Sequence, residues 1–142
     1  MFTRYAIYYT PEPGTPLAEF GATWLGWDSA AGAARGQPSA NGLDVAQITA
    51  TPRKYGFHGT IKPPFRLAEG MTAQGLADAV AGLCADAASV TLAGLKLARL
   101  GRFLALVPPG DASALGTLAG RAGQALDTFT AHPHQAALAN AR

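Results

Sequence analysis

Short strand-like runs and helical runs follow one another in mixed order along the chain, and this order constrains the fold more than any other feature. Runs rich in β-branched and aromatic residues cover residues 4–10, 55–62, 90–100 and 103–107. Apolar residues recur at helical spacing after Pro16, after Thr72 and after Asp111. Patterns of period two predict strands, and patterns of period 3.6 predict helices. About four strands and three or four helices in mixed order predict an α+β fold.

Capping residues set the expected ends of the helices. The first helix is expected to begin at Pro16 and to end at Gly26, because glycine ends many helices. Thr72 is the expected N-cap of the second helix. Either Asp111 or Ser113 is expected to cap the last helix. The side chains expected to face inward from that helix are Leu115, Leu118, Ala122, Leu126 and Phe129.

Prolines and glycines predict the connections between these segments. Residues 28–41 consist mostly of Ala, Gly, Ser, Pro and Gln without a usable period, which is typical of an exposed loop. Thr51-Pro52 predicts a turn before the strand at residues 55–62, and Pro63-Pro64 is expected to end that strand. Gly101-Arg102 predicts a two-residue hairpin turn between the last two strands.

The composition is that of one compact domain, and we expect residues 1–142 to form a single domain. The chain has 142 residues, of which 49% are hydrophobic, so it is long enough to bury a core. Eleven basic and 9 acidic residues give a net charge of +2, too small a bias for binding duplex nucleic acid.

The cysteine content and the apolar runs favour a cytoplasmic protein. Cys84 is the single cysteine, so it cannot form an internal disulfide, which favours a reducing compartment. It lies in the apolar run 76–88, where we expect it to be buried. The first residues lack the apolar stretch of an export signal, and no run approaches about 18 apolar residues. We therefore expect neither export nor membrane insertion.

Residues 55–65 read Y-G-F-H-G-T-I-K-P-P-F and place three polar side chains at alternate positions. On a strand, His58, Thr60 and Lys62 project from the same face. An imidazole that titrates near neutral pH can pass a proton to or from an ester oxygen. A hydroxyl can donate to a phosphate oxygen, and an ammonium group can stabilise developing negative charge. The spacing predicts a phosphate-handling H-x-T motif with His58 and Thr60 as its working pair.

An H-x-T tripeptide also has an ordinary interpretation. His58 and Thr60 are then polar residues on a half-solvated sheet face, and Lys62 lies in water at the end of the strand. A metal-dependent hydrolase is disfavoured, because the sequence lacks clustered His, Asp and Glu ligands.

The motif is part of a longer pattern. The string P-R-K-Y-G-F-H-G-T-I-K-P-P-F follows an opening strand, R-Y-A-I-Y-Y-T-P, and a segment W-L-G-W-D. In this order the segments resemble the two-histidine (2H) phosphoesterase superfamily, in particular the branch found with bacterial phosphonate-utilisation genes. The resemblance implies a bilobal α+β fold whose lobes each have an antiparallel sheet with helices packed on one face. Two H-x-T or H-x-S motifs, one from each lobe, would face each other across a cleft.

The resemblance also implies an activity. It suggests a metal-independent hydrolase that needs no cofactor and acts on a small-molecule cyclic phosphate, either ribosyl or nucleoside, in phosphonate metabolism. One histidine would be the general base and the other the general acid. By the same resemblance His58 and Thr60 are the expected catalytic residues of the first motif, and Lys62 and Tyr55 are expected to contact the substrate.

Only the first of the two motifs is found in the sequence. The other histidines are His132 and His134, and the residues two positions further on are His134 and Ala136, so the required hydroxyl is missing. Pro133 also disfavours a central strand there. We therefore expect residues 1–142 to be the first lobe, the N-terminal portion, of such a protein, with impaired turnover. The alternative is a non-catalytic module that binds phosphate or RNA ends. The sequence does not indicate an oligomeric state.

Overall fold

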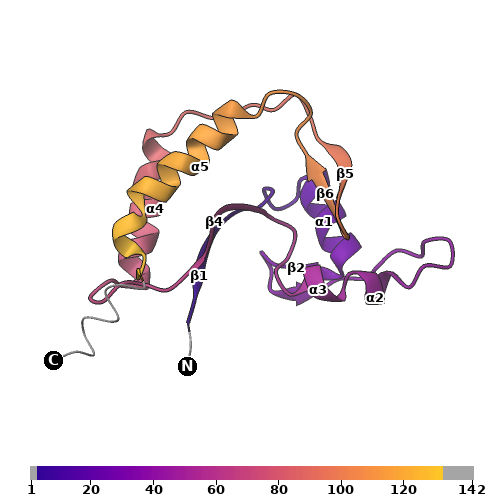
Figure 1. Ribbon diagram of the computed structural model, residues 1–142. Helices are drawn as coiled ribbons and strands as arrows, with labels where there is room; N and C mark the ends of the chain where they lie inside the picture. The colour runs from indigo at the N-terminus through magenta and orange to yellow at the C-terminus, as the bar shows by residue number, and fades with distance from the viewer. Residues whose placement is uncertain (1–2, 133–142) are drawn as a thin grey trace. The chain divides into compact units, whose positions relative to one another are not determined.

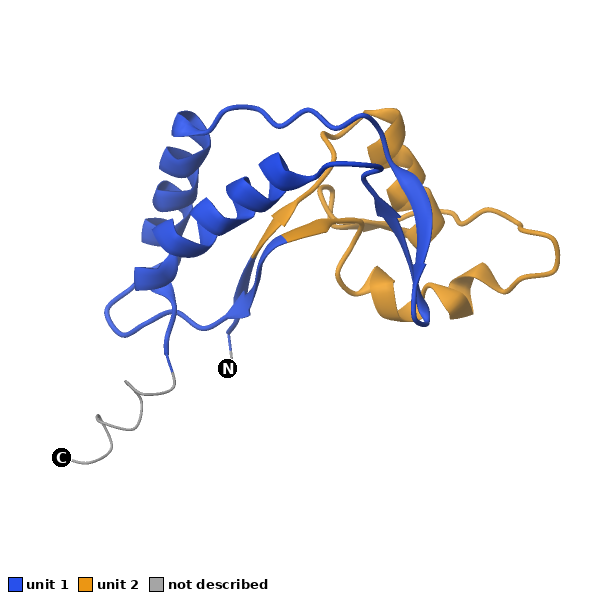
Figure 2. Ribbon diagram, turned by 45° about the horizontal axis from the view of Figure 1, so that its top comes forward, with its two compact units in different colours: residues 1–6, 61–142 blue, residues 7–60 orange. Residues whose placement is uncertain are grey.

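The computed structural model describes residues 3–132 and has two compact units (Figures 1 and 2). Unit 2 comprises residues 7–60, and unit 1 comprises the residues before and after this range. Strands β1 (Tyr5–Tyr9) and β4 (Gly59–Phe65) pair in a two-stranded sheet, and each strand has residues in both units.

Unit 2 is organised around helix α1 (Pro16–Leu25). This helix contacts β2 (Trp27–Asp28), α2 (Val45–Ile48) and α3 (Ala50–Arg53). Strand β2 pairs antiparallel with β3 (Ala33–Ala34). These short elements lie in the segment of the chain between β1 and β4. The two strands are far apart in the sequence but are neighbours in the sheet.

Helix α1 begins and ends where the sequence predicts. The Thr15 hydroxyl oxygen accepts a hydrogen bond from the backbone N–H of Ala18, and Pro16 occupies the first helical position. Gly26 ends the helix with a φ of 72°, in the left-handed region that glycine adopts readily. Leu25 is only 5% exposed, so the apolar face of the helix contributes to the core of unit 2.

Arg53 holds the small helices of unit 2 together. Its Nε donates to the carbonyl oxygen of Leu25 at 2.7 Å. Its Nη2 donates to the carbonyl oxygen of Ala46 at 2.8 Å and to Thr49 Oγ1 at 2.9 Å. The side-chain oxygen of Gln37 accepts from the same nitrogen at 3.2 Å. One guanidinium group therefore connects α3 to the end of α1, to α2 and to the preceding loop.

Three expectations for the connections are wrong. Residues 28–41 contain the short β2–β3 pair rather than loop alone. Thr51-Pro52 lies inside α3 rather than in a turn, and proline is tolerated there because the first N–H groups of a helix have no intrahelical partner. Pro63-Pro64 lies inside β4 rather than at its end. A two-stranded sheet gives β4 an edge where a missing N–H is tolerated.

The helices of unit 1 pack against each other. Helix α4 (Ala73–Asp86) contacts α5 (Ser113–Ala125), which is followed by the 3-10 turn η1 (Asp127–Phe129). Leu76 is 5% exposed and Leu126 is 0% exposed, so both helices contribute to one apolar core. The inward orientation predicted for Leu126 is confirmed.

The caps of the two helices differ. Thr72 Oγ1 accepts from the N–H of Gly75 at 3.0 Å, so the predicted N-cap is confirmed. The expectation that Asp111 or Ser113 is the N-cap of α5 is wrong, because the N-cap position is Ala112. The side chain of Asp111 accepts from the N–H of Ser113 at 2.8 Å. The hydrogen bonds from Ser113 hold the pKa of Asp111 below its ordinary value of 3.8.

The expectation that Cys84 is buried is wrong. Cys84 is exposed, whereas Leu76 is buried and Leu83 is half-buried. Burial therefore decreases toward the C-terminal half of α4, where Cys84 lies. An apolar run in the sequence predicts the helix but not which of its turns are covered.

Strands β5 (Lys96–Leu100) and β6 (Phe103–Val107) form the predicted hairpin, with Gly101 in its turn at a φ of 64°. The strand expected from residue 90 begins only at Lys96. Gly94 precedes it with a φ of 147°, a conformation that does not belong to a regular strand.

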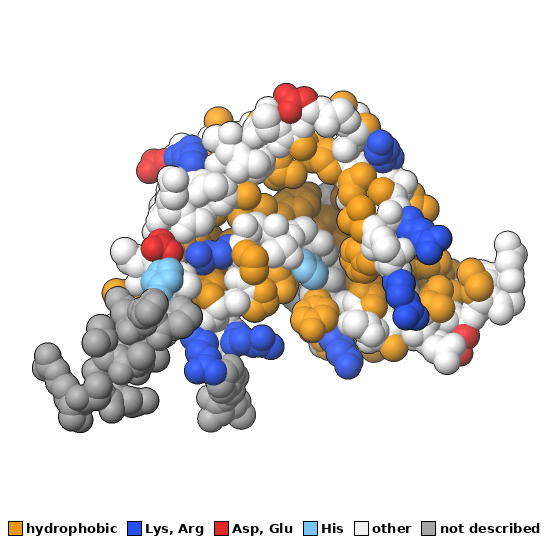
Figure 3. All heavy atoms as spheres, in the orientation of Figure 1, with side chains coloured by type: hydrophobic (Ala, Val, Ile, Leu, Met, Phe, Trp, Pro, Cys, Tyr) orange, Lys and Arg blue, Asp and Glu red, His pale blue; other side chains and the backbone are white. Residues whose placement is uncertain are grey.

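The hairpin leaves large apolar side chains exposed on both faces. Leu97 and Leu104 lie on one face and are 69% and 62% exposed. Leu100 and Phe103 are opposite each other on the other face and are 57% and 56% exposed. Hydrophobic side chains are visible over much of the surface in Figure 3, interspersed with Lys and Arg.

The predicted α+β class is confirmed. The strands of the described residues pair as β1–β4, β2–β3 and β5–β6 in three two-stranded sheets, and the latter two pairs are antiparallel. Within residues 3–132, every helix is too short or too polar to cross a lipid bilayer.

Candidate functional site

The H-x-T motif straddles the start of strand β4. His58 is half-buried and lies immediately before the strand, while Thr60 is its second residue and is exposed. The sequence predicts a strand from Tyr55, and this boundary is wrong. Gly56 has a φ of 73°, a left-handed conformation that interrupts an extended run, and the strand begins only at Gly59.

Gly56 is held where no side chain fits. A Cβ atom built at this position would lie 2.8 Å from the Cβ of Ser29. Real Cβ atoms are essentially never this close to a heavy atom to which they are not bonded, so a larger residue would displace the backbone or Ser29. Both the φ angle and this close approach favour glycine. The chain therefore turns sharply two residues before His58.

The carbonyl group of Gly56 fixes the imidazole of His58. Nδ1 of His58 lies 2.9 Å from the carbonyl oxygen of Gly56. A carbonyl oxygen can only accept a hydrogen bond, so Nδ1 carries the proton and is the hydrogen-bond donor. In the neutral imidazole Nε2 is then unprotonated and has a lone pair available as a base. The backbone conformation thus selects one tautomer.

Tyr8 of strand β1 fixes the plane of the same imidazole. The two ring centroids are 3.8 Å apart and the ring planes differ by 24°, so the rings are stacked. The pairing of β1 with β4 brings these two distant segments of the chain together. Stacked aromatic rings of this kind stabilise by about 0.5–1.5 kcal/mol beyond their area burial. His58 is therefore restrained by both a hydrogen bond and a ring contact.

The two residues expected to contact a substrate lie in different units. Tyr55 is 57% exposed, and its ring centroid is 6.5 Å from that of His58. Lys62 belongs to unit 1, where its Nζ lies 5.2 Å from the ring centroid of Phe65, within range of a cation–π interaction. Tyr55, His58 and Thr60 all belong to unit 2.

His132 lies in unit 1 and has a partner there. Its Nε2 is 3.2 Å from Oδ1 of Asp127, and both side chains are at least half exposed. His134 lies outside the described residues. Within residues 3–132, no three or more His, Cys, Asp or Glu side chains are grouped closely enough to hold a metal ion.

Sequence reasoning missed two residues of this arrangement. The sequence could have indicated Gly56, because a glycine shortly before a strand often adopts a backbone conformation that other residues avoid. The sequence could not have indicated Tyr8, since no local pattern pairs a residue of the first strand with His58.

The chain is an α+β protein with one H-x-T motif at the start of a strand. It belongs to the family described as "Protein of unknown function (DUF1045)", whose model matches residues 60–142. The matched range contains Thr60 and begins two residues after His58.

Two curated relatives are similar over nearly the whole chain. A protein of Janthinobacterium sp. (strain Marseille), named ribose 1,5-bisphosphate phosphokinase PhnN, is 35% identical over 143 residues, which cover 99% of this chain and 32% of the relative. A protein of the same name from Laribacter hongkongensis (strain HLHK9) is 34% identical over 128 residues, covering 90% of this chain and 31% of the relative. The chain thus spans about a third of these relatives. No solved structure matches it.

Proposed function

We propose that the chain carries a metal-independent phosphoesterase site for a small cyclic phosphodiester, with His58 as the proton-transfer residue. The observation that supports this most is the hydrogen bond between His58 Nδ1 and the carbonyl oxygen of Gly56. It leaves Nε2 as the basic atom, which a proton-transfer role requires. The stacked ring of Tyr8 supports the same role, because it limits rotation of the imidazole.

The neighbouring side chains suggest how a phosphate would be held. Thr60 is exposed two residues after His58, and its hydroxyl would donate a hydrogen bond to a non-bridging phosphate oxygen. The exposed ring of Tyr55 would contact the substrate beside the imidazole. Lys62 would supply a cation for the phosphate charge. In this proposal residues 1–142 form one lobe of a two-motif protein, and turnover by this lobe alone is impaired.

The relatives support the class of substrate. Their name describes a kinase of ribose 1,5-bisphosphate, a ribose phosphate. Together with the resemblance to the phosphonate-associated 2H branch, this favours a ribosyl cyclic phosphate over a cyclic nucleotide. We propose a role in bacterial phosphonate metabolism in the cytoplasm.

The test is the hydrolysis of ribose cyclic phosphate and of 2′,3′-cyclic nucleotides by the purified chain, with EDTA present. The variants are His58→Ala and, as a matched control, His132→Ala, which removes an exposed histidine of the other unit. We expect His58→Ala to lower the rate by a factor of roughly 10²–10⁴ and His132→Ala to leave it unchanged. Equal, measurable rates for the wild type and His58→Ala would exclude the proposal.

The alternative is a module that binds phosphate or RNA ends without turnover, and a binding measurement separates it from an enzyme. Titration with a non-hydrolysable cyclic phosphate analogue should then show binding that survives His58→Ala in part, since Thr60 and Lys62 would remain. Binding without hydrolysis in the wild type would favour this alternative.

A further inference from the structure

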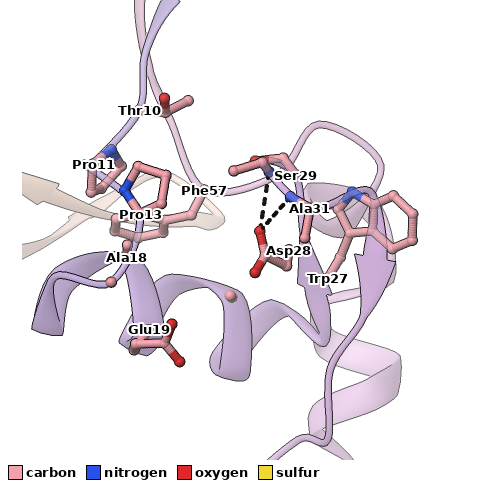
Figure 4. A pocket seen from close by; sticks show the side chains of 13 residues that line it. Thr10, Pro11, Pro13, Ala18, Glu19, Trp27, Asp28, Ser29, Ala31 and Phe57 are labelled. Carbon is pink, nitrogen blue, oxygen red and sulfur yellow. Dashed lines mark hydrogen bonds between the residues drawn. The ribbon is translucent and has the colours of Figure 1, made fainter.

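Unit 2 contains a cavity of about 300 Å³ that the H-x-T motif does not use. It is a partly open cavity, lined by the segment that joins β1 to α1, by one face of α1, and by β2 with the turn that follows it (Figure 4). His58, Thr60, Tyr55 and Lys62 are absent from its lining. The volume is at the lower end of the range for small-molecule sites.

The walls of the cavity are largely apolar. Pro11 and Pro13 lie on one side with the ring of Phe57, and Ala18 on α1 lies beneath them (Figure 4). Pro11 is buried and Phe57 is half-buried. A Cβ atom at Gly21 would lie 2.3 Å from Cγ of Phe57, so the backbone of α1 holds this ring closely. The apolar wall is therefore a fixed surface.

The charge of the cavity comes from Asp28, because the other carboxylate of the lining, Glu19, is paired with Arg35. Oδ1 of Asp28 accepts hydrogen bonds from the N–H groups of Ala30 and Ala31 at 3.1 and 3.0 Å, which hold the turn in place (Figure 4). Oδ2 of Asp28 has no hydrogen-bond partner among residues 3–132. Glu19 lies on α1, and one of its oxygens accepts from the guanidinium of Arg35.

The lining favours a cation and disfavours an anion. It contains Glu19 and Asp28 but no Lys, Arg or His among the described residues. Phe57 and Trp27 add aromatic rings, whose negative faces attract cations. A phosphate group would be repelled by the carboxylate of Asp28.

We propose that this cavity binds a small organic cation with a flat apolar body, such as an arylamidine or a protonated aromatic amine. The cationic group pairs with Oδ2 of Asp28, and the ring lies against Phe57 and the two prolines. The charge-assisted hydrogen bond fixes the orientation, and the apolar walls supply the burial. This site is separate from the H-x-T motif and does not depend on its function.

The test uses three probes of nearly the same shape and different charge: benzamidine, benzamide and benzoate. Each is titrated into the ¹⁵N-labelled chain, and backbone amide shifts are followed. We expect benzamidine to shift the amides of residues 10–31 and Phe57 saturably. Benzamide should bind at least about tenfold more weakly, because it cannot form the charge-assisted hydrogen bond. Benzoate should not bind.

Two variants locate the cation. Asp28→Asn keeps an oxygen that can accept from Ala30 and Ala31, so the turn is retained while the charge is lost. It should weaken benzamidine binding at least about tenfold. Glu12→Gln removes a nearby exposed carboxylate that does not line the cavity, and it should leave the affinity unchanged. The proposal is overturned by equal binding of benzamidine and benzamide, by an unaffected Asp28→Asn, or by no saturable shift up to about 10 mM.

Discussion

The ring of Tyr8 lies 3.8 Å from the ring of His58, centroid to centroid, and connects the first strand of the chain to the H-x-T motif. This contact restrains the plane of the imidazole, while the carbonyl oxygen of Gly56 restrains its rotation and its tautomer. Each restraint comes from a different part of unit 2. The histidine is therefore positioned by tertiary structure as well as by its place beside β4.

Replacing Tyr8 should test the ring contact. Tyr8→Leu keeps an apolar side chain on β1 but loses the stacked ring, and we expect the free energy of unfolding to fall by about 0.5–1.5 kcal/mol. Tyr8→Phe keeps the ring and is the matched control, with little expected change. Urea denaturation measures both. Equal effects of the two substitutions would mean that the ring contact contributes nothing.

Gly56→Ala should be clearly destabilising. Alanine at a φ of 73° is strained, and its Cβ would lie 2.8 Å from that of Ser29. We expect a loss of about 2–4 kcal/mol, the sum of the backbone strain and the steric overlap. Gly70→Ala is the control, because Gly70 has a φ of 80° and open space around it, so only the strain of about 1 kcal/mol applies. Thermal unfolding of both variants should show the difference, and similar losses would contradict the close approach at Gly56.

Local signals in the sequence predicted the longer elements well. Thr15, Pro16 and Gly26 determine the ends of α1 through caps and a left-handed glycine, which depend only on neighbouring residues. The N-cap of α4 at Thr72 follows from the same chemistry.

The short elements and the contacts of the site depend on distant residues. Helix α3 contains Pro52 and is held by Arg53, whose acceptors lie on α1, α2 and a loop. The stacking of Tyr8 on His58 requires the pairing of β1 with β4. Periodicity in one segment contains no information about such partners, so the sequence predicted the motif but not the residues that position it.

Arg53→Ala should test the network of unit 2. The substitution leaves the carbonyl oxygens of Leu25 and Ala46 and the side-chain oxygen of Gln37 without the donor that Arg53 supplies. The hydroxyl oxygen of the buried Thr49 keeps the hydrogen bond from Gln37 Nε2. We expect a loss of roughly 2–4 kcal/mol in the free energy of unfolding, measured with urea. Lys54→Ala removes the adjacent exposed cation and should change stability by no more than about 0.5 kcal/mol. A loss below about 1 kcal/mol for Arg53→Ala would contradict the structural role assigned to it.

Asp111 should make a pH-dependent contribution to stability. Its pKa in the folded chain is lowered from 3.8 by the hydrogen bonds from Ser113. A lowered pKa means that the stabilisation is fully present above the unfolded-state value and is lost as the pH falls through the folded-state value. Asp111→Ala should therefore be less stable than the wild type at pH 6, and the difference should decrease below about pH 4. A difference that is the same at pH 6 and pH 2.5 would contradict this.

We infer that Nε2 of His58 is the basic atom of the motif, because Nδ1 keeps its proton and donates a hydrogen bond to the carbonyl oxygen of Gly56. Long-range ¹⁵N–¹H correlation of the histidine side chains, recorded above about pH 8 where imidazoles are neutral, reads the tautomer of each ring directly. His58 is expected to carry its proton on Nδ1. A proton found on Nε2 would contradict the account, because the hydrogen bond to Gly56 would be absent and the proposed base would not be free.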